Sequence, residues 1–228
     1  MTELFYPHHE IELVERRIAE ACRRAGRPRQ QVTLIAVSKL QPEAKIRQAF
    51  AAGLRDFGEN YAQELRDKAV ALSDCPGLRL HAIGTLQRNK VKYVAQFASS
   101  FHALCDLSIA QALSARRLAN PLPVFLEVNL ARQTTKGGVS PEQIEALADP
   151  VRKLPGLQLV GLMTMPPMSS AGDGLPDQNR PYFAKLRKLG ESLGLSELSM
   201  GTTGDFEVAI EEGATVVRVG RSIFGERS

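Results

Sequence analysis

Short apolar segments with strand character alternate with amphipathic segments along almost the whole chain, and this alternation restricts the fold more than any other feature. The expected strands are short, apolar and rich in β-branched residues, and they cover residues 33–38, 54–57, 78–83, 99–104, 123–130, 157–163, 197–200 and 215–219. The helices expected between them cover residues 42–52, 60–72, 87–96, 107–118, 141–153, 182–193 and 205–211. One further amphipathic helix, 10–25, precedes the first strand.

Parallel strands joined by helices form either an open doubly wound sheet or a closed barrel. Eight expected strands favour the barrel, and a chain of 228 residues with 43% hydrophobic residues has the size and the core of one such domain. Residues 1–228 contain no linker-like stretch. We therefore predict a single α/β domain, a (β/α)₈ barrel of the TIM type with an extra N-terminal helix.

Charge and cysteine content argue against several classes of protein. The formal net charge is +4, but lysines and arginines are interspersed with acids and form no dense basic run, which argues against nucleic-acid binding. No stretch is apolar over the thickness of a bilayer. The odd set of cysteines, Cys22, Cys75 and Cys105, contains no CxxC pair, which argues against a disulfide framework or a zinc site. We expect a cytoplasmic protein that binds neither nucleic acid nor membrane.

Two glycine-containing loops follow the last two expected strands. The first runs from Ser199 through Gly201 and Thr202 to Thr203, and the second begins at Gly220. In such barrels the loops after strands seven and eight commonly bind phosphate, because backbone N–H groups, hydroxyls and a helix dipole meet there. Either loop alone is equally compatible with an ordinary glycine-rich turn. The two loops together predict a phosphate site.

Lys39 follows the first expected strand in phase with Ile35 and Val37, so the three side chains share one face. If that face lines the barrel, the amine lies in the barrel mouth, partly desolvated and near other cations. Those surroundings favour the neutral amine, which attacks an aldehyde to form a Schiff base. The alternative is a lysine whose ammonium reaches solvent at the end of the strand.

Arg218 lies between valines in the last expected strand, in phase with Val216 and Gly220. A buried guanidinium needs a partner, because an unpaired buried charge is costly. One candidate partner is the pyridine nitrogen of a cofactor, and the other is the carboxylate of Glu127 in the fifth strand. The sequence leaves both open.

Five motifs connect these positions: AVSK (36–39), FGENYAQE (57–64), HAIGTLQRNK (81–90), LSMGTTGDFEVAI (198–210) and VRVGRSIFG (217–225). Their order and spacing resemble the pyridoxal 5′-phosphate (PLP) homeostasis protein family, and the resemblance extends over residues 12–226. It implies a fold shared with the N-terminal barrel of alanine racemase. It also implies that PLP is the cofactor, held as a Schiff base on Lys39.

The same resemblance assigns roles to further residues. Arg218 would face the pyridine nitrogen, while Asn60 and His81 would line the pocket. The phosphate would be held by Ser199, Gly201, Thr202 and Thr203 and by the backbone at Gly220 and Arg221. The chain departs from the family pattern at 202–203, where Met-Ser is usual, and at 221, where threonine is common. A threonine hydroxyl at 203 can still donate, but a side-chain hydroxyl contact at 221 is lost.

Two other segments have no assigned role. Lys136 lies in a stretch that resembles the family's Lys-x-Gly segment and would attract phosphate weakly, although a solvated loop lysine is the simpler interpretation. A loop rich in Pro, Gly and Ser, residues 166–178, is expected to be the most mobile part of the chain.

A cofactor carrier and an enzyme are the two functions that compete. Racemisation needs an acid/base group on each face of the substrate carbon. Lys39 serves one face, but the tyrosine that serves the other in alanine racemase comes from an appended domain that has no counterpart before residue 228. An arginine at the ring nitrogen also weakens PLP as an electron sink. A sugar-phosphate isomerase on the same barrel would leave Lys39 without a task.

We therefore predict a PLP-binding homeostasis protein without catalytic turnover, with a PLP-dependent amino-acid racemase as the alternative. The expected partners are PLP and, as recipients of the cofactor, PLP-dependent apo-enzymes. The expected assembly state is a monomer or a weak dimer.

Overall fold

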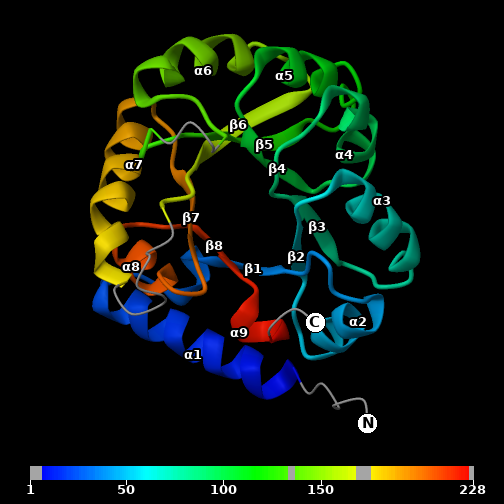
Figure 1. Ribbon diagram of the computed structural model, residues 1–228, viewed down its shortest axis with the longest axis vertical. Coiled ribbons are helices and arrows are strands. Elements are labelled where there is room, and N and C mark those ends of the chain that lie inside the picture. The colour runs from blue at the N-terminus through cyan, green and yellow to red at the C-terminus, as the bar shows by residue number, and fades with distance from the viewer. Residues whose placement is uncertain (1–6, 133–136, 168–175, 226–228) are drawn as a thin grey trace.

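Eight parallel strands pair in chain order and close into a barrel in the computed structural model, which describes residues 7–132, 137–167 and 176–225. The strands are β1 (Thr33–Val37), β2 (Asp56–Glu59), β3 (Arg79–Ala82), β4 (Ser100–Leu104), β5 (Leu122–Glu127), β6 (Leu157–Met163), β7 (Glu197–Thr202) and β8 (Val216–Val219). Pairing of β8 with β1 completes the ring (Figure 1). The predicted (β/α)₈ barrel is confirmed.

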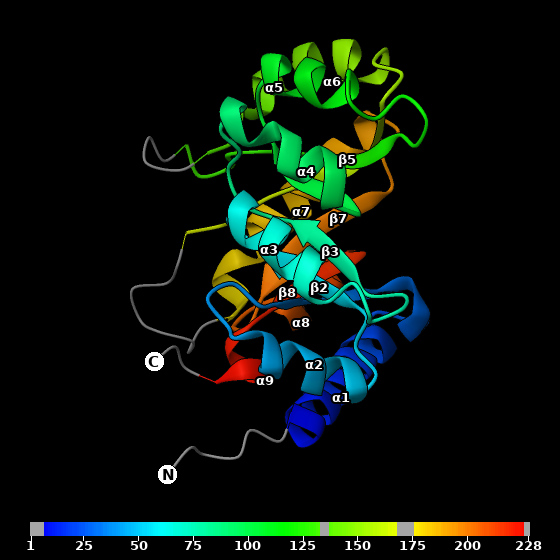
Figure 2. The same ribbon diagram turned by 90° about the vertical axis from the view of Figure 1, so that its right-hand side faces the viewer.

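Helices surround the strands on the outside of the barrel. They are α2 (Glu43–Ala51), α3 (Ala62–Ala71), α4 (Val91–Phe97), α5 (Leu107–Ser114), α6 (Ile144–Arg152), α7 (Arg180–Ser192), α8 (Phe206–Glu211) and α9 (Arg221–Phe224). Short 3₁₀ turns stand at Arg29–Gln31, Arg88–Lys90, Pro141–Gln143 and Pro176–Asn179. Figure 2 shows α2 to α5 following one another along one side of the molecule. Among these helices, α3, α5, α6, α7 and α8 make the most extensive contacts with the strands. Strands covered by helices on their outer face read as nearly continuous apolar runs.

The extra N-terminal helix, α1 (Pro7–Arg24), packs against α8, α9 and α2. Its buried side chains recur at helical spacing: Ile11, Val14, Ile18, Ala21 and Cys22. Arg17 adds a bidentate ion pair to Glu207 on α8, with a shortest N–O distance of 2.8 Å. The predicted helix at 10–25 is therefore confirmed, and it starts three residues earlier.

The structure corrects several of the predicted element bounds. The expected strand 123–130 ends at Glu127 and the expected helix 107–118 ends at Ser114. β2 begins at Asp56 rather than 54, because the Leu54 N–H bonds back to Ala49 O at 3.1 Å and closes the end of α2 after Gly53, whose φ is +104°. β7 continues to Thr202, which pairs with Arg218 of β8. A helix also follows the last strand, contrary to the prediction. This helix, α9, buries the apolar pair at 223–224.

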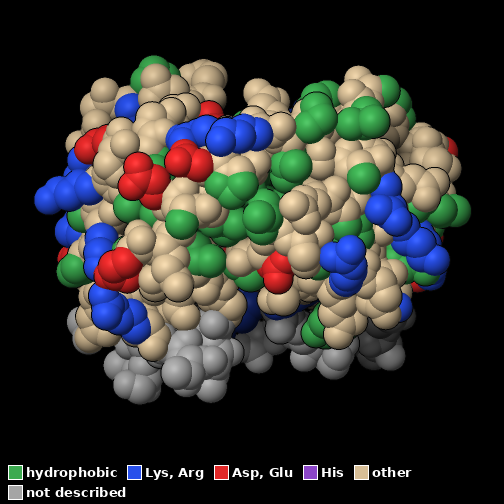
Figure 3. Space-filling model, turned by 90° about the horizontal axis from the view of Figure 1, so that it is seen from above, with side chains coloured by type: hydrophobic (Ala, Val, Ile, Leu, Met, Phe, Trp, Pro, Cys, Tyr) green, Lys and Arg blue, Asp and Glu red, His purple; other side chains and the backbone are tan. Residues whose placement is uncertain are grey.

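Charges of both signs are mixed on the surface. On the face shown in Figure 3, lysine and arginine side chains lie beside aspartate and glutamate, with hydrophobic side chains between them. Cys22, Cys75 and Cys105 are all free thiols. Within the described ranges, no helix is both long and apolar enough to cross a membrane, and no group of three or more His, Cys, Asp or Glu side chains is placed to hold a metal ion.

Candidate functional site

A cavity of about 330 Å³ opens where the C-terminal ends of the strands meet, a size typical of small-molecule sites. Seven of the ten predicted site residues line it: Lys39, Asn60, Thr202, Thr203, Arg218, Gly220 and Arg221. Apolar side chains, among them Val37, Ile83 and Met163, form much of the remaining wall. The cavity therefore combines an amine, a guanidinium and a hydroxyl-bearing loop with apolar surface.

Lys39 comes directly after β1, and its half-buried side chain lines the cavity together with Val37. The two share a face, as the alternation of side chains predicted. β1 pairs with β8 on one side and with β2 on the other, so Lys39 stands between the strands that carry Arg218 and lead to Asn60.

Arg218 is 3% exposed and lies on β8. Its Nη1 donates to Ser199 Oγ at 2.5 Å, and its Nη2 donates to Thr164 O at 3.0 Å and contacts Met165 Sδ at 2.9 Å. Burial lowers the pKa of the Arg218 guanidinium to about 10, while the charges of Asp205 and Glu127 act in the opposite direction. Glu127 lines the same cavity, so it supports the cation electrostatically.

The two predicted phosphate loops lie side by side. The Gly220 N–H donates to Thr203 Oγ1 at 3.3 Å and joins them. The Thr202 N–H and hydroxyl both donate to Asp205 Oδ1, at 2.6 and 3.1 Å, and Asn179 Nδ2 donates to the other oxygen of that carboxylate at 2.7 Å. Both hydrogen-bond donors of Thr202 are therefore taken up by Asp205, directly before α8. Of the two threonines, Thr203 is the better placed to donate into the cavity.

Three predicted site residues lie away from the cavity lining. Gly201, with φ +91°, faces α8: a Cβ there would stand 2.6 Å from Ala209 Cβ, so helix packing requires this glycine. Ser199 is fully buried on β7, and His81 is buried on β3. Both β3 and β7 continue past these residues before they reach the cavity. The side chains of Ser199 and His81 therefore lie deeper in the barrel.

His81 and Ser199 belong to a hydrogen-bonded chain that crosses the barrel interior. Ser199 Oγ, which accepts from Arg218, also bonds to His102 Nδ1 at 2.8 Å. His102 Nε2 bonds to Ser100 Oγ at 2.7 Å. The His102 ring also stacks on Phe125, with centroids 4.2 Å apart.

The chain continues from Ser100 to the far side of the barrel. Ser100 Oγ bonds to His81 Nδ1 at 2.7 Å, and His81 Nε2 bonds to Asp56 Oδ1 at 2.9 Å. Burial alone would raise the pKa of Asp56, but hydrogen bonds from Arg79 and His81 outweigh it and lower that pKa to about 2. The chain thus ends on an ionised carboxylate.

The donor and acceptor in each of these hydrogen bonds follow from the residues at the two ends of the chain, Arg218 and Asp56. An arginine only donates and a carboxylate only accepts. With both rings neutral, His81 must donate from Nε2 to Asp56 and accept at Nδ1 from Ser100, and the same order repeats at His102. In that state, two serines and two histidines connect the buried cation of Arg218 to the carboxylate of Asp56.

We predict that nitrogen NMR of the protein near pH 8 will show His81 and His102 as the tautomer protonated on Nε2. Burial, together with the neighbouring His81 and Arg218, lowers the pKa of His102 well below its ordinary value, so this ring will stay neutral as the pH falls through 6.5. A His102→Phe variant supplies the assignment. Protonation of the His102 ring with a midpoint near 6.5 would contradict the prediction.

Sequence reasoning missed Asp56, Ser100 and His102. A signal for the last two exists in the sequence, since Ser100 and His102 are polar residues at alternate positions of an otherwise apolar strand. The sequence prediction considered only the residues at the ends of the strands, so it left out the side chains of β4 that face the barrel interior. Lys136 and residues 168–175 of the expected loop lie outside the described residues.

Comparisons with known proteins give a consistent result. A family model described as "Alanine racemase, N-terminal domain" matches residues 11–228. A pyridoxal phosphate homeostasis protein of Pseudomonas aeruginosa is 46% identical to the chain over 221 residues, which are 95% of this chain and 94% of that protein. A protein of the same name from Aquifex aeolicus is 43% identical over 225 residues, 95% and 96% of the respective chains.

A solved structure is similar at the level of the fold and of the sequence. PipY of Synechococcus elongatus with PLP bound matches with a TM-score of 0.77 at 33% identity, over 91% of this chain and 100% of that one.

Proposed function

The chain belongs to the alanine racemase N-terminal domain family, as its motifs predicted, and from that membership we propose that it is a PLP-binding homeostasis protein that holds PLP as a Schiff base on Lys39. The relatives named above are called homeostasis proteins rather than enzymes. PLP, when bound, supplies an electrophilic aldehyde, an anionic phosphate and a pyridine ring.

One observation carries the proposal: an amine, a buried guanidinium and a threonine-glycine loop pair share a single cavity on adjacent strands. Lys39 would hold the aldehyde carbon, and Arg218 would meet the ring nitrogen. Thr203, Gly220 and the backbone at Arg221 would hold the phosphate. The residues present therefore fit each functional group of PLP, and the apolar wall suits the ring.

The lining of the cavity favours a carrier over a racemase. Racemisation requires a second acid/base group opposite the lysine. Among the described residues that line the cavity there is no tyrosine, histidine or cysteine, and the carboxylate in that lining, Glu127, supports the charge of Arg218. Tyr61 is 56% exposed and lines a neighbouring groove instead. Arg218, a donor with a pKa near 10, would also keep a ring nitrogen unprotonated and PLP a poor electron sink.

An open, non-catalytic cavity suits exchange of PLP with apo-enzymes as recipients. The three free thiols fit a reducing cytoplasm. We propose a monomer or weak dimer as the working state, with binding to neither nucleic acid nor membrane.

The test of the proposed function is the absorption spectrum of the purified protein, before and after addition of PLP. We expect a visible band from a Schiff base at about one equivalent of PLP per chain, and no mirror-image product when the loaded protein is incubated with single-enantiomer amino acids. A spectrum without that band would overturn PLP binding through lysine, and steady appearance of the other enantiomer would favour the racemase.

A further inference from the structure

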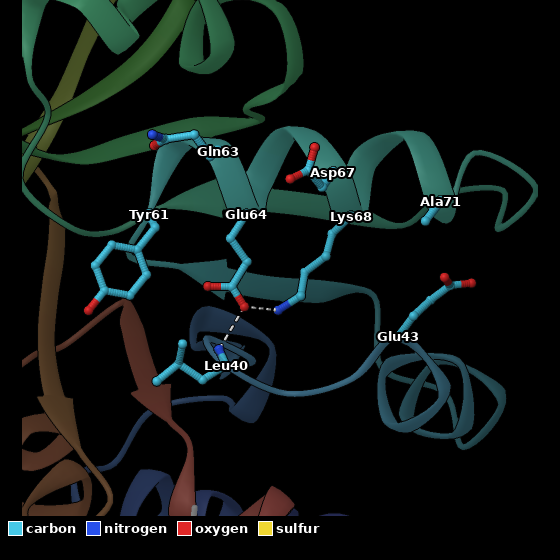
Figure 4. A pocket seen from close by; sticks show the side chains of 8 residues that line it. All are labelled: Leu40, Glu43, Tyr61, Gln63, Glu64, Asp67, Lys68 and Ala71. Atoms are coloured by element: carbon cyan, nitrogen blue, oxygen red, sulfur yellow. Dashed lines mark hydrogen bonds and ion pairs between the residues drawn. The ribbon is translucent and has the colours of Figure 1, made fainter.

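A shallow groove of about 600 Å³ lies beside the cofactor cavity, between α3 and the segment that follows β1 (Figure 4). At its base stands Lys68 of α3, which is only 7% exposed. Its Nζ donates to Ser38 O at 2.7 Å, to Glu59 Oε1 at 2.8 Å and to Glu64 Oε1 at 2.6 Å. All three hydrogens of the ammonium are thus used in hydrogen bonds to these acceptors.

Both carboxylates that meet Lys68 also accept a hydrogen bond from a residue next to Lys39. Ser38 Oγ donates to Glu59 Oε1 at 2.5 Å, on the N-terminal side of Lys39. The Leu40 N–H donates to Glu64 Oε1 at 2.6 Å, on the C-terminal side, as the dashed line in Figure 4 shows. Glu59, Glu64 and Lys68 therefore hold the two residues that flank Lys39, the residue proposed to bind PLP.

Leu40 adopts a conformation that needs such support. Its φ is +61°, a left-handed value that the Cβ of an L-residue disfavours. Its side chain is 62% exposed, so burial of apolar surface does little to hold it there. The hydrogen bond to Glu64 fixes the peptide N–H that this conformation presents.

We propose that Glu59, Glu64 and Lys68 form a positioning unit, here called the Lys68 clamp, that fixes the backbone on both sides of Lys39 and thereby directs its amine into the cofactor cavity. This inference rests on the proposed function, because it concerns the reaction of Lys39 with PLP. The clamp residues act through the backbone and are absent from the lining of the cavity itself.

The chemistry of the cluster supports a positioning role over plain packing. Burying the Lys68 ammonium and the Glu59 carboxylate is costly, and apolar side chains of similar size often stabilise such a contact as well. Burial raises the pKa of Glu59, against the opposing positive charge of Lys68. The hydrogen bonds that offset this cost converge on residues 38–40 rather than on the body of the barrel.

The experiment measures the rate at which added PLP produces the visible band in Lys68→Met and Glu64→Ala variants freed of cofactor. We expect the rate to fall about tenfold or more in each, because small displacements of a reacting group cost large factors in rate. Hydrogen exchange at the Leu40 amide should accelerate in both variants, also without PLP. Glu64→Gln, which keeps an acceptor for that amide, should stay within about twofold of the wild type, as should Lys188→Met, a change at an exposed lysine of α7.

The outcomes separate the two proposals. A wild-type protein that forms no band refutes the proposed function, while the exchange rate of the Leu40 amide still tests the clamp. A wild type that forms the band, with unchanged rates in both clamp variants, refutes the clamp. If Lys68→Met does not fold, Glu64→Ala decides, because it leaves the pair of Lys68 with Glu59 in place.

Discussion

Lys39→Ala will abolish covalent attachment of PLP and leave the barrel folded. Lys39 follows the end of β1, outside the strand ladder, and it is half-buried, so its truncation should change the free energy of unfolding by no more than about 1 kcal/mol. The loss of the adduct should be complete, because no substitute amine stands at that point of the cavity among the described lining residues. Residual, noncovalent PLP is expected from the contacts at Thr203 and Gly220.

Borohydride reduction followed by mass mapping checks this prediction. In the wild type the reduced adduct should be found on the peptide that contains Lys39, and Lys188→Ala, at an exposed position of α7, should retain it. Lys68 lies near Lys39 in space, since its Nζ contacts Ser38 O, but its ammonium is held by three acceptors and buried outside the cavity. An adduct on any other lysine of the wild type would refute the assignment.

Arg218→Glu will change the absorption spectrum of bound PLP and strongly destabilise the protein. A carboxyl group at this place can share a proton with the ring nitrogen, which the guanidinium cannot, so the visible band should shift. The variant also leaves Ser199 Oγ and Thr164 O without their donor and adds an acid near Glu127 and Asp205. Removing one partner from a buried charged network typically costs roughly 3–5 kcal/mol.

Absorption spectra and chemical denaturation measure the two effects separately. Arg221→Glu is the matched control, since it makes the same change of charge at an exposed residue of the same cavity, and it should weaken phosphate binding without shifting the band. Ser199→Ala removes one acceptor of Arg218 and keeps the guanidinium, so its spectrum should stay close to that of the wild type. An unchanged band in Arg218→Glu would disprove the contact with the ring nitrogen.

The sequence by itself determined the barrel and the main residues of the cavity. Strand and helix periodicities are local properties, so eight apolar segments separated by amphipathic ones were sufficient to predict the closed parallel sheet. The in-phase positions of Lys39 and Arg218 then followed from the alternation of side chains along a strand. The helix α9 was missed because four residues are too few to show a helical period.

Only the tertiary structure decided which polar side chains meet. The contact between His102 and Ser199 spans 97 positions of the chain, and Arg218 reaches Thr164 across 54. No local pattern relates residues so far apart, because their distance depends on the order and register in which the strands close the barrel. For the same reason the sequence could not show that Lys68 reaches the backbone beside Lys39, across 30 positions of the chain.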